Sequence, residues 1–280
     1  MRPGLAVHRG NRPAAAVTQA PPARPWRVAV NLFTVIPAPV AAEIRKDAAA
    51  RAVLWLPVVG LLIGAVAAGV LLGAEAGGDF AARRLLAAVL ALAVLAMLTG
   101  GLHLDGLADT ADGLGSRRPG EEALAVMRRS DVGPMGVAAL LFVILLQIAA
   151  LAALPAGWAG AAALVLAVVT GRVAVVIVAG TSTPSARPEG FGALVAATAT
   201  ARSRLVITSC LLAVVAAGGA VVGGAPLAAR GLGATLAGLL AAELIRGVAR
   251  RRLGGMTGDV FGAVIEISTA TVLLVLALST

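Results

Sequence analysis

Runs of apolar residues, each about 20 positions long, recur through most of the 280-residue chain and constrain its fold more than any other feature. A helix of that length crosses the hydrocarbon core of a bilayer. The composition agrees, because 13% of the residues are charged, whereas soluble domains are about one quarter charged. The runs lack the alternation of barrel strands, and lipid offers no water to backbone groups. The sequence therefore predicts an all-α, polytopic membrane bundle.

We predict seven spans, preceded by a short N-terminal helix. The spans cover residues 52–73, 84–101, 134–154, 157–180, 204–223, 231–249 and 260–279. The apolar segment 26–36 is too short to cross and is followed by two prolines, so we expect it to be interfacial or re-entrant. Residues 1–25 lack the apolar core of a signal peptide and are predicted to be a disordered tail. Residues 26–280 then form one polytopic catalytic domain.

Basic residues set the orientation. With the N-terminus in the cytoplasm, 19 of the 23 Lys and Arg residues face that side, three face the other side, and Arg172 lies within a span. This asymmetry predicts a cytoplasmic N-terminus, with the polar segments 102–133, 181–203 and 250–259 on the same side. The net charge of +9 is thus explained by topology rather than by nucleic-acid binding. The single cysteine, Cys210, excludes an internal disulfide.

The most informative motif is GGLHLDGLADTADG at 100–113, directly after the second span. If it is helical, Asp105, Asp109 and Asp112 share one face and repel one another. A hard cation such as Mg²⁺ would relieve that repulsion and could hold a diphosphate for phosphoryl transfer. One of the aspartates, or His103, could accept the proton of an attacking hydroxyl. The alternative is that these residues are a solvated loop.

Downstream, segment 119–131 is predicted to be a short helix on the membrane surface. Leu124 and Met127 are expected to face lipid, while the charged residues face water. Arg128 and Arg129 have two readings: they clamp phosphate, or they set the topology.

Charged residues within the spans need a partner or a polar cavity. Arg172 is expected either to pair with Glu243 or Glu266 or to bind substrate. In the last polar segment, glycines at 254–258 precede Asp259 and would allow backbone to approach phosphate, although the Lys-Ser/Thr pair of a P-loop is missing.

The motif at 100–113 resembles, almost residue for residue, the signature of the cobalamin synthase family, the adenosylcobinamide-GDP ribazoletransferases. Similar matches occur at Phe33 to Pro39, at 57–60 (P-x-V-G), at 187–190 (R-x-E-G) and at 253–263 (LGGMTGDVFGA). The resemblance implies a Mg²⁺-dependent enzyme of the bacterial inner membrane. Such an enzyme joins adenosylcobinamide-GDP to α-ribazole, or its 5′-phosphate, and releases GMP.

The resemblance also implies roles for individual residues. Asp105, Asp109 and Asp112 would hold Mg²⁺ on the diphosphate, with one of them or His103 positioning the nucleophile. The expected substrate-binding residues are Arg128, Arg129, Ser130, Asp131, Arg172, Arg187, Glu189, Thr257, Asp259 and Glu266. Arg129-Ser130-Asp131 reverses the Asp-Ser-Arg order of many members, and Gln147 stands where a Lys is common. The expected partners are the corrinoid nucleotide, α-ribazole and membrane lipid, with no nucleic acid. The resemblance leaves open a homo-oligomer or a complex with other cobalamin-assembly enzymes.

Two other functions compete with this reading. A CDP-alcohol phosphotransferase would use a similar aspartate array, but the Arg expected soon after Asp105-Gly106 is missing. A cation transporter would need polar groups near the middle of the membrane, whereas these acids gather at one face. Both alternatives therefore rank behind the ribazoletransferase.

Overall fold

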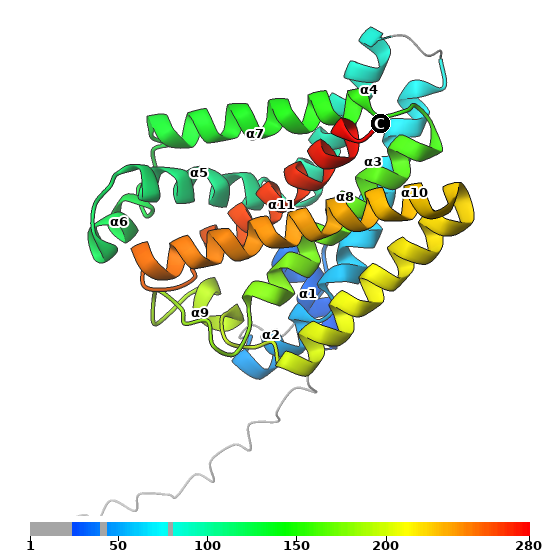
Figure 1. The fold of residues 1–280 in the computed structure, drawn as a ribbon. Helices are drawn as coiled ribbons and strands as arrows, with labels where there is room; N and C mark the ends of the chain where they lie inside the picture. Colours follow the sequence, from blue (N-terminus) through cyan, green and yellow to red (C-terminus); the bar gives the residue numbers. More distant parts are fainter. Residues whose placement is uncertain (1–23, 40–43, 78–80) are drawn as a thin grey trace, which may run out of the picture.

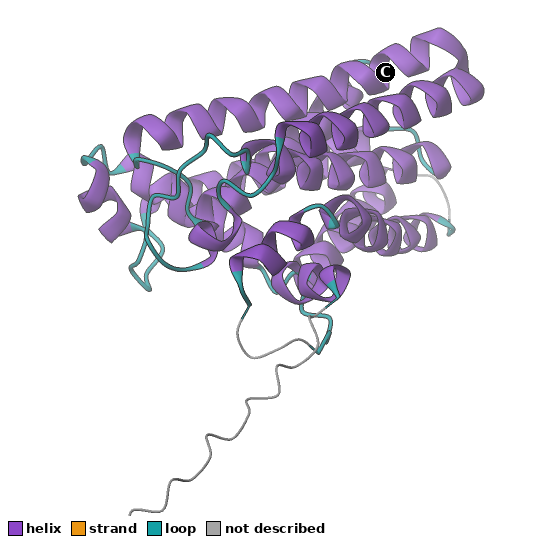
Figure 2. Cartoon of the chain, turned by 90° about the horizontal axis from the view of Figure 1, so that it is seen from below, coloured by secondary structure: helices purple, strands orange, loops and turns teal. Residues whose placement is uncertain are grey.

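The computed structural model describes residues 24–39, 44–77 and 81–280, and within that part of the chain every regular element is a helix (Figures 1 and 2). The all-α prediction is confirmed. The predicted disordered tail lies outside the described residues except for its last two positions. The helices are α1 (Pro25–Phe33), α2 (Lys46–Val53), α3 (Leu56–Glu75), α4 (Ala81–Leu98), α5 (Leu102–Gly115), α6 (Gly120–Val126), α7 (Pro134–Ala153), α8 (Trp158–Val178), α9 (Phe191–Val195), α10 (Ala201–Arg252) and α11 (Gly258–Leu278).

Six helices of the described chain are long and apolar enough to cross a membrane, namely α3, α4, α7, α8, α10 and α11. Five of them have 18 to 21 residues, which corresponds to about 30 Å of helix and matches the hydrocarbon thickness. The sixth, α10, has 52 residues. The predicted polytopic bundle is confirmed.

Helix α10 is a hairpin rather than one straight rod. Gly223 and Gly224 leave helical geometry, Gly224 has a φ of 69°, and Pro226 follows. A Cβ atom built on Gly231 would lie 2.8 Å from Val215 Cγ1, although 16 residues of straight helix would separate the two by about 24 Å. Figure 1 shows the two antiparallel arms. They correspond to the two spans predicted at 204–223 and 231–249.

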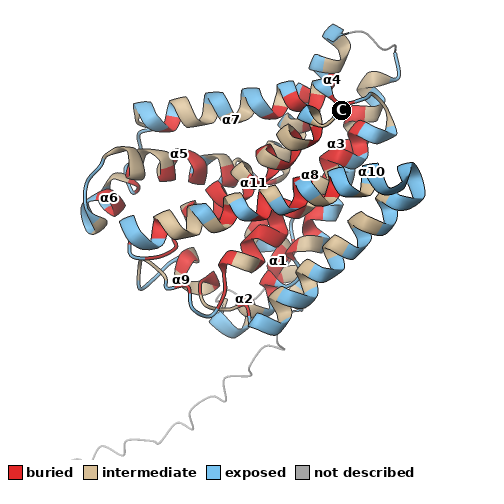
Figure 3. Cartoon of the chain, viewed as in Figure 1, coloured by how far each residue is buried: buried red, intermediate tan, exposed pale blue. Residues whose placement is uncertain are grey.

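Helices α8 and α11 form the centre of the bundle. Two thirds (67%) of the most apolar window of each is buried inside the protein, against 0% for that of α10 (Figure 3). Glycines let α8 and α10 approach α11 closely, because a Cβ on Gly171 would lie 3.0 Å from Ile265 O and one on Gly238 would lie 3.1 Å from Ser268 O. The outer helices therefore present apolar, protein-free surface to lipid.

The short helices gather at one end of the bundle, opposite the C-terminus and the bend of α10 (Figure 1). We call the part formed by α2, α6, α9 and residues 180–200 and 253–257 the polar end. Backbone hydrogen bonds join its segments, with Ala186 N donating to Met256 O at 2.9 Å and Met256 N to Pro184 O at 2.9 Å. The prediction that the polar segments share one face is confirmed.

Of two short helices predicted from the sequence, one is found as expected and the other differs in which side its apolar residues face. The segment predicted as a short N-terminal helix is α1, and Phe33 of α1 packs edge-to-face on Phe191 of α9 at 5.2 Å. The surface helix predicted at 119–131 is α6, but Leu124 and Met127 do not face lipid. They are 5% and 3% exposed, since Gly113 of α5 leaves room for the Met127 side chain. That part of the prediction was wrong.

Candidate active site

Two glycines place the acidic helix. Gly100 and Gly101 adopt left-handed conformations with φ values of 60° and 72°, which favour glycine, and Gly101 N donates to Ala96 O at 2.8 Å. The chain thereby leaves the axis of α4 and begins α5, which packs between α7 and α11. The aspartate motif is thus helical, which is the condition for its three aspartates to share one face.

Helix α5 touches the start of α11 through backbone. A Cβ on Gly106 would lie 2.6 Å from Asp259 O, and a Cβ on Gly262 would lie 3.1 Å from His103 O. No larger side chain fits at Gly106 without moving a helix. This close contact brings Asp259 beside the acidic face of α5.

We call Asp105, Asp109, Asp112 and Asp259 the acid group. Asp105 is exposed, and the other three are partly buried. The pKa of Asp109 is raised to about 6, chiefly by burial and then by the negative charges of Asp105, Asp259 and Asp112, while Arg187 opposes the shift. The four carboxylates are therefore close enough to hinder ionisation at Asp109.

Asp112 is already engaged by the start of α7. Its Oδ2 accepts a hydrogen bond from Gly133 N at 2.7 Å, and its Oδ1 accepts one from Gly136 N at 2.8 Å. The first N–H groups of a helix lack partners within the helix and attract negative charge. Asp112 thus anchors α7 to α5.

Arg187 forms an ion pair with Asp259, and its Nη1 lies 3.7 Å from Asp259 Oδ2. Its Nη2 donates to Leu124 O at 3.1 Å, which fixes the guanidinium between α6 and α11. Thr257, 1% exposed, caps α11 by accepting from Val260 N and donates to Asp259 Oδ2 at 3.2 Å. The side chains around Asp259 are thus held in place by several contacts.

The described residues fit a hard cation in chemistry, although no three of their His, Cys, Asp or Glu side chains already converge on one point. Asp105, Asp109 and Asp259 supply only oxygen donors, which suit Mg²⁺. Their mutual repulsion, visible in the raised pKa of Asp109, is what a divalent cation would relieve. These side chains would have to rotate toward one another to share one ion.

Three further expected site residues, His103, Arg172 and Glu266, lie on the side of α5 opposite the acid group, and together with Gln147 we call them the inner polar group. His103 is about 200° from Asp105 around the helix. All four residues line a cavity of about 190 Å³ between the spans. Gln147 Nε2 donates to Glu266 Oε2 at 2.9 Å, and Arg172 is 4% exposed. The structure does not bring this group to the acid group.

Of the two glutamates expected as partners of Arg172, the fold brings one into the same cavity. Glu266 shares its cavity, whereas Glu243 pairs within α10, where it accepts from Arg246 Nε at 2.9 Å. His103 is 3% exposed, and neither ring nitrogen has a hydrogen-bond partner in the described part of the chain.

The turn between α6 and α7 carries Arg128, Arg129, Ser130 and Asp131, all exposed. Arg129 binds Asp131 through two hydrogen bonds of 3.0 and 2.7 Å. This pair lowers the pKa of Asp131. The local pair therefore exists although its two residues are in reversed order, and the charge of Arg129 also acts on Asp112.

Comparison with known proteins decides the family. The model of the cobalamin-5-phosphate synthase family matches residues 25–277. The chain belongs to this family. Relatives named adenosylcobinamide-GDP ribazoletransferase include one from Frankia casuarinae, 38% identical over 90% of this chain and 94% of the relative. Another, from Brevibacillus brevis, is 37% identical over 89% and 95%, and one from Pseudomonas paraeruginosa is 39% identical over 90% and 96%. No solved structure matches.

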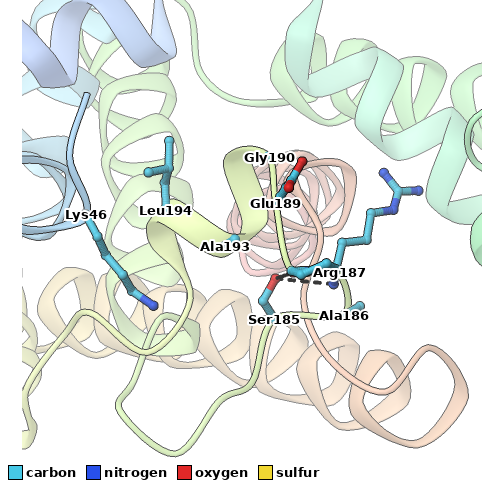
Figure 4. A pocket seen from close by; sticks show the side chains of 9 residues that line it. Lys46, Ser185, Ala186, Arg187, Glu189, Gly190, Ala193 and Leu194 are labelled. Atoms are coloured by element: carbon cyan, nitrogen blue, oxygen red, sulfur yellow. Dashed lines mark hydrogen bonds between the residues drawn. The ribbon is translucent and has the colours of Figure 1, made fainter. Parts of the chain in front are cut away.

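Membership of the cobalamin-5-phosphate synthase family confirms the resemblance read from the sequence, and the chain is a multi-pass membrane protein of a bacterial family. The sequence reading missed two polar residues that the fold makes prominent. Gln147 was given no charge role, yet it bonds Glu266. Lys46, the only lysine of the chain, lines the side of a pocket opposite Arg187 (Figure 4). Its rarity was the one available signal.

Proposed function

We propose that this chain is an adenosylcobinamide-GDP ribazoletransferase. The observation that carries the proposal is the acid group beside Arg187 in a chain whose relatives bear that name along almost their whole length. A hydroxyl of α-ribazole, or of its 5′-phosphate, attacks the phosphorus on the cobinamide side of the diphosphate. A new P–O bond forms, the P–O bond to GMP breaks, and a carboxylate takes the hydroxyl proton.

The residues of the acid group divide this work. Asp105, Asp109 and Asp259 are the ligands we expect for Mg²⁺, with Asp259 in place of Asp112, because Asp112 is engaged by α7. When bound, Mg²⁺ would offset the negative charge of the diphosphate. Arg187 is placed to bind a phosphate oxygen, since its guanidinium already lies 3.7 Å from Asp259.

The proton acceptor is better sought in the acid group than at His103. His103 faces the inner cavity on the other side of α5, where no carboxylate of the acid group is among the described lining residues. A general base must lie within hydrogen-bond reach of the proton that it takes. We therefore assign the inner polar group to holding α5 against α8 and α11.

We also propose that the polar end faces the cytoplasm of a bacterial inner membrane. The support is the predicted topology, in which 19 of the 23 Lys and Arg residues, with Lys46, Arg51 and Arg187 of the polar end among them, lie in segments on that side of the membrane. A cysteine introduced by Glu121→Cys in a Cys210→Ser background tests it. A membrane-impermeant maleimide should label this variant in inverted vesicles and not in intact spheroplasts, and the reverse pattern would contradict the orientation.

The activity is tested with membranes that contain the chain, supplied with adenosylcobinamide-GDP, α-ribazole and Mg²⁺. We expect GMP and a complete cobalamin in equal amounts. Membranes without the chain are the control. Absence of GMP, together with ion uptake into proteoliposomes, would support a transporter instead, and turnover of a CDP-alcohol would support the phosphotransferase.

A further inference from the structure

A pocket of about 740 Å³ opens at the polar end, between α2, α9 and residues 185–190 (Figure 4). Its volume lies within the range of small-molecule sites, about 300–1,000 Å³. Lys46 enters from α2, and Glu189 comes from the facing segment. The pocket thus offers both a cation and a carboxylate.

The wall of this pocket is fixed before any ligand arrives. Ser185 Oγ donates to Arg187 O at 2.7 Å, and Ser185 and Met256 form a backbone bridge. Ala186 N also donates to Met256 O at 2.9 Å. Because Met256 directly precedes the cap of α11, the pocket wall and Asp259 belong to one rigid unit. Such preorganisation lowers the cost of binding.

Arg187 joins the pocket to the acid group. It lines the pocket, and its side chain extends away from Lys46 toward Asp259, 3.7 Å distant (Figure 4). If the diphosphate of the activated substrate binds at the acid group, one of its ends is linked to the corrinoid. Its other end lies next to this pocket. The group at that other end is a nucleoside.

We propose that this pocket binds the guanosine of the activated substrate, an inference that rests on the proposed function. Glu189 accepts hydrogen bonds from the adjacent N1–H and 2-amino group of guanine, and Lys46 contributes a positive charge that attracts the anionic nucleotide as a whole. The corrin macrocycle with its side chains is far larger than the pocket. The base of α-ribazole has no N–H donors on its ring edge, so Glu189 would have nothing to accept.

The experiment measures binding of GMP and IMP to the full chain in nanodiscs. IMP retains N1–H but lacks the 2-amino group. We expect the wild type to prefer GMP about tenfold, the value of one hydrogen bond to a charged group. Glu189→Gln should weaken GMP binding about tenfold and abolish the preference. Lys46→Gln should weaken GMP and IMP equally, and Glu121→Gln, an exposed acid outside the pocket, should change neither.

The direction in which Glu189→Gln changes the affinity for GMP distinguishes specific recognition of guanine from a general electrostatic effect. Removing a negative charge should by itself favour an anionic nucleotide, so weaker GMP binding in Glu189→Gln means lost hydrogen bonds. A wild type that binds no GMP, or a Glu189→Gln variant that binds GMP as well as the wild type, would overturn the proposal. The proposal would also be overturned if Glu189→Gln raised only the KM for α-ribazole.

Measurements on the same nanodisc preparation test the proposed function and the assignment of the pocket separately. A wild type that releases no GMP from adenosylcobinamide-GDP and α-ribazole contradicts the proposed function itself. Turnover with GMP binding indifferent to Glu189 contradicts only the assignment of the pocket.

Discussion

The two faces of α5 carry polar groups of opposite character. One face belongs to the acid group, in which four carboxylates gather, Asp259 pairs with Arg187 and Asp105 is exposed. The other face contributes His103 to the inner polar group, in which Arg172 and Glu266 line the same cavity between the spans. The acid group has excess negative charge and is accessible to a ligand. The inner polar group has balanced charge and is shielded by apolar helices.

This difference separates a ligand site from an internal support. Excess negative charge is costly unless a cation completes it, so the acid group is built for a ligand that the chain does not supply. Opposite charges within the inner polar group offset each other inside the fold. Variants on the two faces should therefore fail in different ways, one in turnover and the other in stability.

The largest effect is expected at Asp109. Asp109→Asn removes a charge from the centre of the acid group, and kcat should fall about 1,000-fold, the upper range for loss of one preorganised electrostatic contact. Membrane insertion and thermal stability should stay at wild-type values, since the variant also removes repulsion. Steady-state GMP release and detergent-solubilised unfolding measure both. Full activity would remove Asp109 from the site.

On the other face, Arg172→Met should destabilise the protein by about 3 kcal/mol, because Glu266 would keep a buried charge without its counter-charge. The double variant Arg172→Met/Glu266→Gln should recover at least half of that loss. Chemical denaturation in detergent micelles compares the three proteins. A double variant no more stable than the single one would mean that the two charges do not balance each other.

The close contact between α5 and α11 at Gly106 gives a further prediction for the acid group. A methyl group at Gly106 would meet Asp259 O at 2.6 Å, so Gly106→Ala should push Asp259 away from the α5 aspartates. A displacement of about 1 Å costs roughly 100-fold in rate. The matched control is Gly73→Ala in α3, where an added methyl meets nothing within 4 Å. Equal rates in the two variants would contradict the close contact.

The smallest effect is expected at Asp112. In Asp112→Asn one of the two backbone N–H groups at Gly133 and Gly136 loses its acceptor, which costs about 1–2 kcal/mol of stability. Turnover should fall about tenfold or less as α7 shifts. Hydrogen exchange at the start of α7 reports the lost contact. Loss of turnover as severe as that of Asp109→Asn would return Asp112 to the metal ligands.

Much of this architecture was accessible from the sequence. Hydropathy predicted the spans, and glycines at 223 and 224 divide α10 near the predicted boundary at 223. Helical spacing placed three aspartates on one face. The motif that carries these aspartates also identified the family, because it consists of a few residue types in one particular order.

The remainder depended on contacts between helices distant in sequence. Spacing within α5 says that His103 and Asp105 face apart, but only the positions of α8 and α11 show that His103 meets Arg172 and Glu266. Asp112 could be recognised as an anchor only once α7 was placed beside α5. Leu124 and Met127 were assigned to lipid because hydropathy does not distinguish lipid from a protein core.

The central claim is that carboxylates of the acid group share one divalent cation with the diphosphate. Mn²⁺ accepts the same oxygen ligands as Mg²⁺, and its binding to the chain in nanodiscs, with adenosylcobinamide-GDP present, is measured by electron paramagnetic resonance. We predict one bound Mn²⁺ per chain, lost in Asp109→Asn and retained in Asp112→Asn. Wild-type Mn²⁺ binding in Asp109→Asn would contradict the account.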